Sequence, residues 1–173
     1  GRRDYTLIVF ALNTGLRNSE VIGLNVVDVN PFGTIVKELN LPALIAKNNK
    51  PRRIPLNDYI ISVLGLYLFE ETNLKRITGD KTPLFRSLYS NKRLGQRDFQ
   101  QILDRHSINA LGRHCNPHIL RHTFATNLVK QADIKIVQEI LGHASLQSTQ
   151  VYLHPSSSEK LDAVNRLTLG HNR

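Results

Sequence analysis

Residues 118–126 read HILRHTFAT and directly follow an Asn-Pro pair, which is typical of a helix start. His118, Arg121 and His122 therefore fall in the first turns of one helix. Imidazole and guanidinium groups in such a cluster suit three kinds of site: a metal site, a basic helix end without catalytic function, or a catalytic corner that binds an anion.

The position of these side chains favours the anion. Backbone N–H groups at a helix start lack partners within the helix, and the helix dipole is positive there. A cationic side chain in that place costs about 0.3–1 kcal/mol, so a helix built only for stability would carry acidic residues instead. We therefore expect an external anion, above all a phosphate, to compensate the charge of Arg121.

Two other interpretations of the cluster stay open. His118 and His122 are four residues apart and could hold a zinc ion, with Cys115 nearby. Against this, no acidic or Cys-x-x-Cys partner adjoins them, and Arg121 would repel a dication. Alternatively, the histidines only cap the helix and pack against it.

Two further stretches contain side chains suited to the same anion. The stretch NTGLRNSEVIGL places Arg17 at the mouth of a helix, just after a glycine that ends the helix before it, although Arg17 could instead pair with Glu20. The stretch LGHASLQSTQVYLH places His143 after another glycine stop, and Tyr152 follows nine residues later. A tyrosine with a pKa of about 10 becomes a nucleophile once its proton is accepted.

Together these stretches resemble the tyrosine recombinase, or phage integrase, family, and most of all its Xer-like and integrase-like members. The resemblance covers essentially the whole chain, and the boxes occur in the family's order. It rests on the boxes TGLRxSE, HxLRHTFAT and LGHxSxxxTxxYxH, which contain Arg17, His118, Arg121, His143 and Tyr152.

A fourth element, AKNNKPRRIPL, resembles the β-hairpin that carries the family's catalytic lysine. The resemblance implies that Lys47 has this role. The preceding segment, with VNPFGTIVKELNLP, looks longer than in compact Xer-type relatives. Lys50 and Lys37 therefore remain alternatives for the lysine.

The resemblance implies that DNA is cut and rejoined without a metal or nucleotide cofactor. Tyr152 would attack a scissile phosphate and form a 3′-phosphotyrosyl bond, which stores the energy for rejoining. His118 would accept the proton of the tyrosine, and Lys47 would protonate the departing 5′-oxygen.

The same resemblance assigns the remaining catalytic positions to the phosphate. Arg17 and Arg121 would donate to its non-bridging oxygens, which gain negative charge in the transition state. His143 would add a hydrogen bond to the phosphate. We expect Glu20 to brace Arg17 or the helix start, and His122 to be structural.

The family also implies a domain organisation and partners. Residues 1–173 would form the C-terminal catalytic domain, with 155–173 as a C-terminal arm, and the N-terminal core-binding domain would lie outside this chain. The expected partner is double-stranded DNA, bound by a homo-tetramer that exchanges these arms, with accessory DNA-bending or regulatory proteins possible. The implied location is the cytoplasm, at the nucleoid.

Two alternative functions stay open for this chain. One is a DNA-binding regulator that does not cut, although all six expected catalytic positions are filled. Another is an enzyme similar to a type IB topoisomerase, which shares the chemistry. The integrase-like boxes and the small size favour the recombinase.

Charge independently favours nucleic acid as the partner. The 173 residues include 23 Lys and Arg against 14 Asp and Glu, a net charge of +9, and the pI is about 10.0. Such an excess favours a polyanionic partner. No apolar run is long enough to span a bilayer, and the single cysteine fits a reducing compartment. The basic clusters supply the candidate DNA contacts Lys50, Arg52, Arg53, Arg97 and Arg113.

The elements that must position these residues are mainly helices. Caps, glycine stops and apolar periodicity predict helices at 4–13, 19–24, 60–71 (capped by Asn57 or Asp58), 97–111, 117 onward, and from Asp133 to Gly142. A last pair is expected at about 146–153 and 159–168. We expect Phe99, Ile102, Leu103 and Ile108 to share one buried face, and Leu120, Phe124 and Leu128 another with Arg121 at its edge.

Short segments rich in β-branched residues predict a small antiparallel sheet. These segments are 34–39, 43–47 and 52–56, with NNKP at 48–51 as the hairpin turn between the last two. Residues 84–87 should be extended. The expected fold class is mainly α with a small antiparallel β-sheet (α+β), as the resemblance to a tyrosine recombinase catalytic domain also implies.

Overall fold

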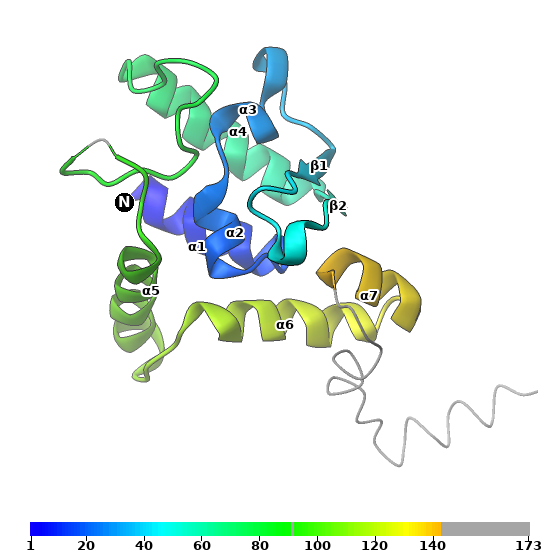
Figure 1. Cartoon of the computed structure of the whole chain (residues 1–173). Coiled ribbons are helices and arrows are strands. Elements are labelled where there is room, and N and C mark those ends of the chain that lie inside the picture. The colour runs from blue at the N-terminus through cyan, green and yellow to red at the C-terminus, as the bar shows by residue number, and fades with distance from the viewer. Residues whose placement is uncertain (91, 143–173) are drawn as a thin grey trace, which may run out of the picture.

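Helices predominate in the part of the chain that the computed structural model describes, residues 1–90 and 92–142 (Figure 1). The helices are α1 (Arg2–Thr14), α2 (Asn18–Gly23), α3 (Val26–Val29), α4 (Asp58–Asn73), α5 (Gln96–Leu111), α6 (Pro117–Val129) and α7 (Ile134–Leu141). The strands are β1 (Glu38–Leu41) and β2 (Arg52–Pro55), with 3-10 turns η1 (Pro31–Gly33) and η2 (Lys47–Asn49). The expected fold class, mainly α with a small antiparallel sheet, is confirmed. The expected helices at 146–153 and 159–168 lie outside the described residues.

Five of the predicted helix ends are confirmed, whereas α1 begins at Arg2, before its expected start at residue 4. Asn57, Asn116 and Asp133 start α4, α6 and α7, each with a side-chain oxygen that accepts a backbone N–H of the first turn. Gly15 and Gly142 end α1 and α7 with φ values of 61° and 64°. Only a residue without Cβ adopts this left-handed conformation at no steric cost.

Within the described residues the sheet has two strands, and the prediction of a strand at 43–47 is wrong. β1 pairs antiparallel with β2, and Leu39 lies opposite Ile54. Pro42 has no N–H to continue the ladder, and its carbonyl instead accepts the N–H of Ala46 at 3.1 Å. A turn and η2 therefore replace both the expected strand and the hairpin turn at 48–51. The first strand also begins later than expected, at Glu38.

The core contains a stacked pair of aromatic rings between α4 and the 84–87 segment. The ring centroids of Tyr67 and Phe85 lie 5.8 Å apart, and those of Phe10 and Phe85 lie 5.9 Å apart. Burial of each such side chain stabilises the folded state by about 1.5–3 kcal/mol. The Tyr67 hydroxyl donates to the Leu84 carbonyl at 3.0 Å, and burial raises the pKa of Tyr67.

The amphipathic pattern of α5 is only partly as expected. Phe99, Ile102 and Leu103 are buried, but Ile108 is 41% exposed. Ile108 follows Phe99 by nine positions, which is half a turn away at 100° per residue. The expectation that Ile108 shares this face is therefore wrong.

Helix α6 packs against α1 and extends from α5 at one end to α7 at the other (Figure 1). Leu120 is buried, and Phe124 and Leu128 are partly buried, so this expected stripe does face the protein. The ring of Phe124 occupies the space that a Cβ at Gly15 would need. The glycine that ends α1 therefore also allows α6 to pack closely.

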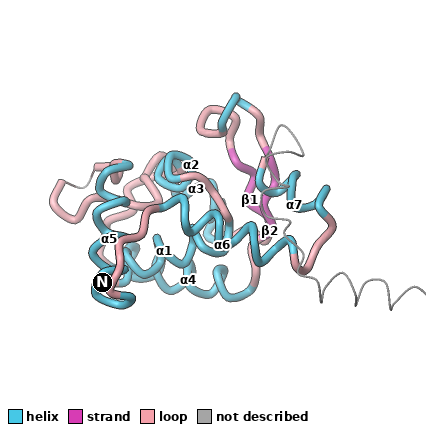
Figure 2. The backbone as a smooth tube through the Cα atoms, turned by 90° about the horizontal axis from the view of Figure 1, so that it is seen from below, coloured by secondary structure: helices cyan, strands magenta, loops and turns pink. Residues whose placement is uncertain are grey.

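The two-stranded sheet lies beside α7 on one side of the molecule (Figure 2), and β2 contacts α7. This places the end of α7 near the strand that carries Arg52.

Among the described residues, no helix combines the length and apolar composition that a membrane crossing needs.

Candidate active site

A pocket of about 250 Å³ lies between the start of α2 and the start of α6. It brings together three of the six predicted catalytic residues, from positions about 100 residues apart in the sequence. Its lining residues are Arg17, Asn18, Ser19, Gln96, Pro117, His118 and Arg121.

Arg17 enters the pocket because two helices meet beside it. Gly15 ends α1, and Arg17 then takes the N-cap position of α2 with extended backbone. Its backbone N–H donates to Oε2 of Glu20 at 2.8 Å, and its Nη1 donates to Oε1 at 3.0 Å. The expected brace between Glu20 and Arg17 is confirmed.

Glu20 is fully buried and has a second arginine partner. Nη1 and Nη2 of Arg52 donate to Oε1 and Oε2 of Glu20 at 3.0 and 2.7 Å. Burial alone would raise the pKa of the Glu20 carboxyl. The hydrogen bonds from Arg52 and from the Arg17 backbone, together with both positive charges, outweigh burial and lower the pKa to about 2. Glu20 is therefore ionised at neutral pH.

Arg121 is 3% exposed and joins three helices. Its Nη1 donates to the carbonyl of Gly15 at 2.6 Å, and its Nη2 donates to the carbonyl of Leu141 at 2.8 Å. These bonds tie α6 to the ends of α1 and α7. The side chain thus lies deeper than the edge position expected from helical periodicity, while still lining the pocket.

His118 is exposed at the start of α6 and lines the same pocket. The side chain of Asn116 accepts the backbone N–H groups of His118 and Ile119 at 3.0 and 3.2 Å. These two amides are therefore used by the cap. An anion in the pocket would depend on side-chain donors more than on the free backbone amides expected at this helix start.

Lys47 lies at the start of η2, where its side chain is exposed. Its backbone nitrogen is 3.5 Å from Oε1 of Glu20, so the segment that carries Lys47 adjoins the Arg17 brace. Lys50 and Lys37 are also exposed, and the choice of Lys47 stays a prediction. His143 and Tyr152 lie outside the described residues; α7 ends at Leu141, and the described chain ends at Gly142, the residue before His143 in the sequence.

The predicted DNA contacts fall into two groups. Four are exposed, namely Lys50, Arg53, Arg97 and Arg113. The Arg52 side chain is only 8% exposed and is held inside the protein by Glu20. A second basic stretch, RSLYSNKRLGQR at 86–97, is also partly internal. Arg86 is buried, with Nη2 at 2.6 Å from Glu71, and Arg93 donates to the carbonyls of Ile22 and Leu24.

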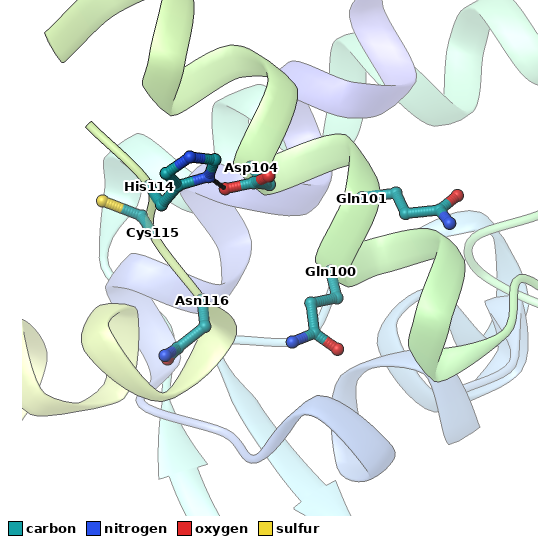
Figure 3. A pocket seen from close by; sticks show the side chains of 6 residues that line it. All are labelled: Gln100, Gln101, Asp104, His114, Cys115 and Asn116. Atoms are coloured by element: carbon teal, nitrogen blue, oxygen red, sulfur yellow. Dashed lines mark hydrogen bonds and ion pairs between the residues drawn. The ribbon is translucent and has the colours of Figure 1, made fainter. Parts of the chain in front are cut away.

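A second pocket, of about 420 Å³, lies between α5 and the segment leading to α6 (Figure 3). Gln100, Gln101 and Asp104 extend from α5, and Nδ1 of His114 lies 2.8 Å from Oδ1 of Asp104.

Cys115 lines this pocket, whereas His118 lines the first. Within residues 1–90 and 92–142, no group of three His, Cys, Asp or Glu side chains gathers as a metal site requires, which leaves the zinc interpretation without support there.

Sequence reasoning missed three polar residues of the first pocket. Asn18 and Ser19 follow Arg17 directly, so their proximity to it was a usable signal. Gln96 comes from the start of α5, and its carbonyl accepts Nδ2 of Asn18 at 3.1 Å. Gln96 reaches the pocket only because α5 packs against α2, so no local signal in the sequence indicates it.

Comparison with known proteins identifies the family of this chain. A model of the phage integrase family matches residues 1–159. The chain belongs to the phage integrase family. The resemblance expected from the sequence boxes is thereby confirmed.

Relatives within the phage integrase family include Xer recombinases. The tyrosine recombinase XerD of Staphylococcus epidermidis is 35% identical over 163 residues, which cover 92% of this chain and 52% of the relative. The tyrosine recombinase XerC of Caldanaerobacter subterraneus subsp. tengcongensis is 36% identical over 168 residues, which cover 95% and 44%. The chain therefore spans about half the length of the curated relatives it matches.

Solved structures of family members have the same fold. The XerA recombinase matches with a TM-score of 0.76 and 27% identity, over 95% of this chain and 57% of that one. The XerH site-specific recombinase bound to its difH substrate matches with a TM-score of 0.73 and 29% identity, over 95% and 46%. The catalytic domain of bacteriophage HP1 integrase, at 24% identity and a TM-score of 0.59, covers 96% and 83% and shows the fold alone. The expected tyrosine recombinase catalytic-domain fold is confirmed.

Proposed function

We propose that this chain is the C-terminal catalytic domain of a site-specific DNA recombinase that cuts and rejoins DNA through a covalent bond to Tyr152. The observation that carries the proposal is the pocket that gathers Arg17, His118 and Arg121 from the starts of two helices. Family membership supports DNA as the substrate, as does the similarity to the XerH site-specific recombinase in its complex with difH.

The pocket supplies what a phosphodiester needs in order to react. The non-bridging oxygens of the phosphodiester carry negative charge and gain more negative charge in the transition state. Fixed guanidinium donors therefore lower the reaction barrier. Arg17 and Arg121 would provide these donors, and each is already held by contacts within the protein. Such preorganised donors are worth about 3–4 kcal/mol each in other enzymes.

The chemical step balances without a cofactor. The Tyr152 oxygen bonds to phosphorus while the bond from phosphorus to the 5′-oxygen breaks. His118 takes the proton of the tyrosine, and Lys47 gives a proton to the departing 5′-oxygen. His143 would donate a hydrogen bond to the phosphate. Rejoining reverses these transfers, because the phosphotyrosyl ester retains the energy of the broken bond.

The remaining parts of the proposal concern assembly and cellular setting. Residues 155–173 would form an arm that docks on a neighbouring protomer in a tetramer on DNA, and a core-binding domain would precede residue 1 in the whole protein. DNA-bending or regulatory proteins could assist, and the setting would be the nucleoid. The exposed side chains of Lys50, Arg53, Arg97 and Arg113 would contact DNA phosphates.

The test is a covalent protein–DNA adduct. Short duplexes of randomised sequence, with a nick just downstream of the varied positions, allow the 5′-hydroxyl fragment to diffuse away after cleavage. The labelled upstream strand should then stay attached to the protein in a denaturing gel, and peptide mapping should find it on Tyr152. Tyr152→Phe should abolish the adduct, and the matched control Tyr89→Phe should keep it, because Tyr89 is fully exposed.

The same assay separates the alternative functions. DNA binding without an adduct from the unaltered chain would indicate a regulator that does not cut. An adduct together with relaxation of a supercoiled plasmid, without strand exchange, would indicate topoisomerase-like activity. An adduct on a residue other than Tyr152 would refute the assignment of the nucleophile.

A further inference from the structure

Arg52 is used entirely within the protein, although it lies in a strongly basic stretch. Each of its three guanidinium nitrogens donates: Nη1 and Nη2 to the two oxygens of Glu20, and Nε to the carbonyl of Ile140 at 2.9 Å. The alternation of β2 turns the next residue outward, so the side chain of Arg53 is 76% exposed. Adjacent arginines therefore have different surroundings.

The contact with Glu20 affects Arg17. Arg52 binds both oxygens of this carboxylate in a fork, whereas among the described contacts the side chain of Arg17 reaches the carboxylate through Oε1. Arg17 is 24% exposed and lines the pocket. If Arg52 were absent, the buried carboxylate would attract the whole guanidinium of Arg17, because a buried charge needs a partner. The fork from Arg52 leaves donors of Arg17 for the pocket.

The contact with Ile140 affects the end of α7. A Cβ at Gly142 would lie 2.9 Å from Cδ of Arg52 and 3.1 Å from its Nη1, so the backbone passes closely over this side chain. The next carbonyl along α7, that of Leu141, accepts a hydrogen bond from Arg121. Two arginines thus hold consecutive carbonyls of α7, directly before the position of His143.

We propose that Arg52 is a positioning residue for phosphate cleavage: it occupies Glu20 so that Arg17 faces the pocket, and it holds the turn that leads to His143. This inference rests on the proposed recombinase function. It replaces the DNA contact expected for Arg52 from the sequence. The residue acts through Arg17 and α7, and does not touch the phosphate.

The test compares Arg52→Gln with Arg53→Gln in the adduct assay and in DNA binding at several salt concentrations. Arg52→Gln should slow adduct formation about 100-fold at saturating DNA, the loss typical of one transition-state donor. It should leave the slope of log affinity against log salt unchanged. Arg53→Gln, which removes an exposed cation, should reduce that slope by about 1. Arg2→Gln, on the exposed pair with Glu70, should change neither quantity.

A double variant tests the mechanism more directly. In Arg52→Gln the charge of Glu20 captures Arg17, so adding Glu20→Gln should release Arg17 and restore adduct formation about tenfold over Arg52→Gln alone. A purely structural role predicts that the second substitution slows the reaction further. Arg52→Lys keeps the charge but cannot form the fork, and should remain at least tenfold slow. If Arg52→Gln does not fold, Arg52→Lys takes its place in every comparison.

Two results would overturn the proposal. One is a smaller salt slope for Arg52→Gln with normal adduct formation at saturation, which would make Arg52 a phosphate contact. The other is a double variant that is slower than Arg52→Gln. Failure of the recombinase proposal is separate, because in that case the unaltered chain would itself form no adduct on Tyr152.

Discussion

Replacing Glu20 with glutamine removes a buried negative charge that two arginines share. Arg17 and Arg52 would keep their positive charges inside the protein and lose the carboxylate that balances them. A pKa lowered from the ordinary value of 4.5 to about 2 corresponds to about 3 kcal/mol of stability at neutral pH. We therefore expect Glu20→Gln to lower the free energy of unfolding by about 3 kcal/mol at pH 7.

The loss should depend on pH in a defined direction. The folded-state pKa of Glu20 lies below the unfolded value, so its stabilisation is complete above about pH 5 and disappears as the pH falls toward 2. By pH 3 the unfolded chain is protonated at this position, and about 2 kcal/mol of the stabilisation is gone. The stability difference between the wild type and Glu20→Gln should shrink to about 1 kcal/mol at pH 3.

Urea unfolding followed by far-ultraviolet circular dichroism would measure this difference, since the chain contains no tryptophan for fluorescence. Glu38→Gln is the matched control, because Glu38 is exposed and lies 3.6 Å from the exposed Arg53. Exposed pairs contribute little, so this variant should follow the wild type at every pH. A difference between Glu20→Gln and wild type that stays constant from pH 7 to pH 3 would refute the electrostatic reasoning.

Two further substitutions test how the pocket is built. Asn116→Ala should lower the free energy of unfolding by about 1 kcal/mol in urea titrations, because the start of α6 loses its cap; an unchanged midpoint would contradict this. Gly15→Ala should cost about 3 kcal/mol, since it adds left-handed strain to a collision with Phe124. Gly33→Ala, at φ 80° in open space, should cost only about 1 kcal/mol, and equal losses at the two glycines would exclude the collision.

Local signals in the sequence predicted much of this structure. Asn116 and Asp133 cap their helices through contacts within three residues, so their identity and position are enough to place α6 and α7. The pairing of Arg17 with Glu20 is also local, across one helical turn. These caps and this pairing are therefore found where the sequence placed them.

The features that the sequence did not predict depend on packing between distant parts of the chain. Arg52 and Arg53 are identical residues side by side, and only the pairing of β2 determines which one faces Glu20. Gln96 reaches the pocket because α5 packs on α2, and no spacing within the sequence connects them. The depth of Arg121 likewise depends on carbonyl acceptors far from it along the chain.

These carbonyl acceptors affect how the site tolerates sequence change. Arg52 and Arg121 donate to main-chain oxygens of Gly15, Ile140 and Leu141, which every amino acid possesses. Side chains at positions 140 and 141 can therefore vary without removing the acceptor, provided that the helix keeps its length and packing. The arginine donors and the loop lengths must therefore be kept. An insertion after α7 should be more harmful than a substitution within its last turn.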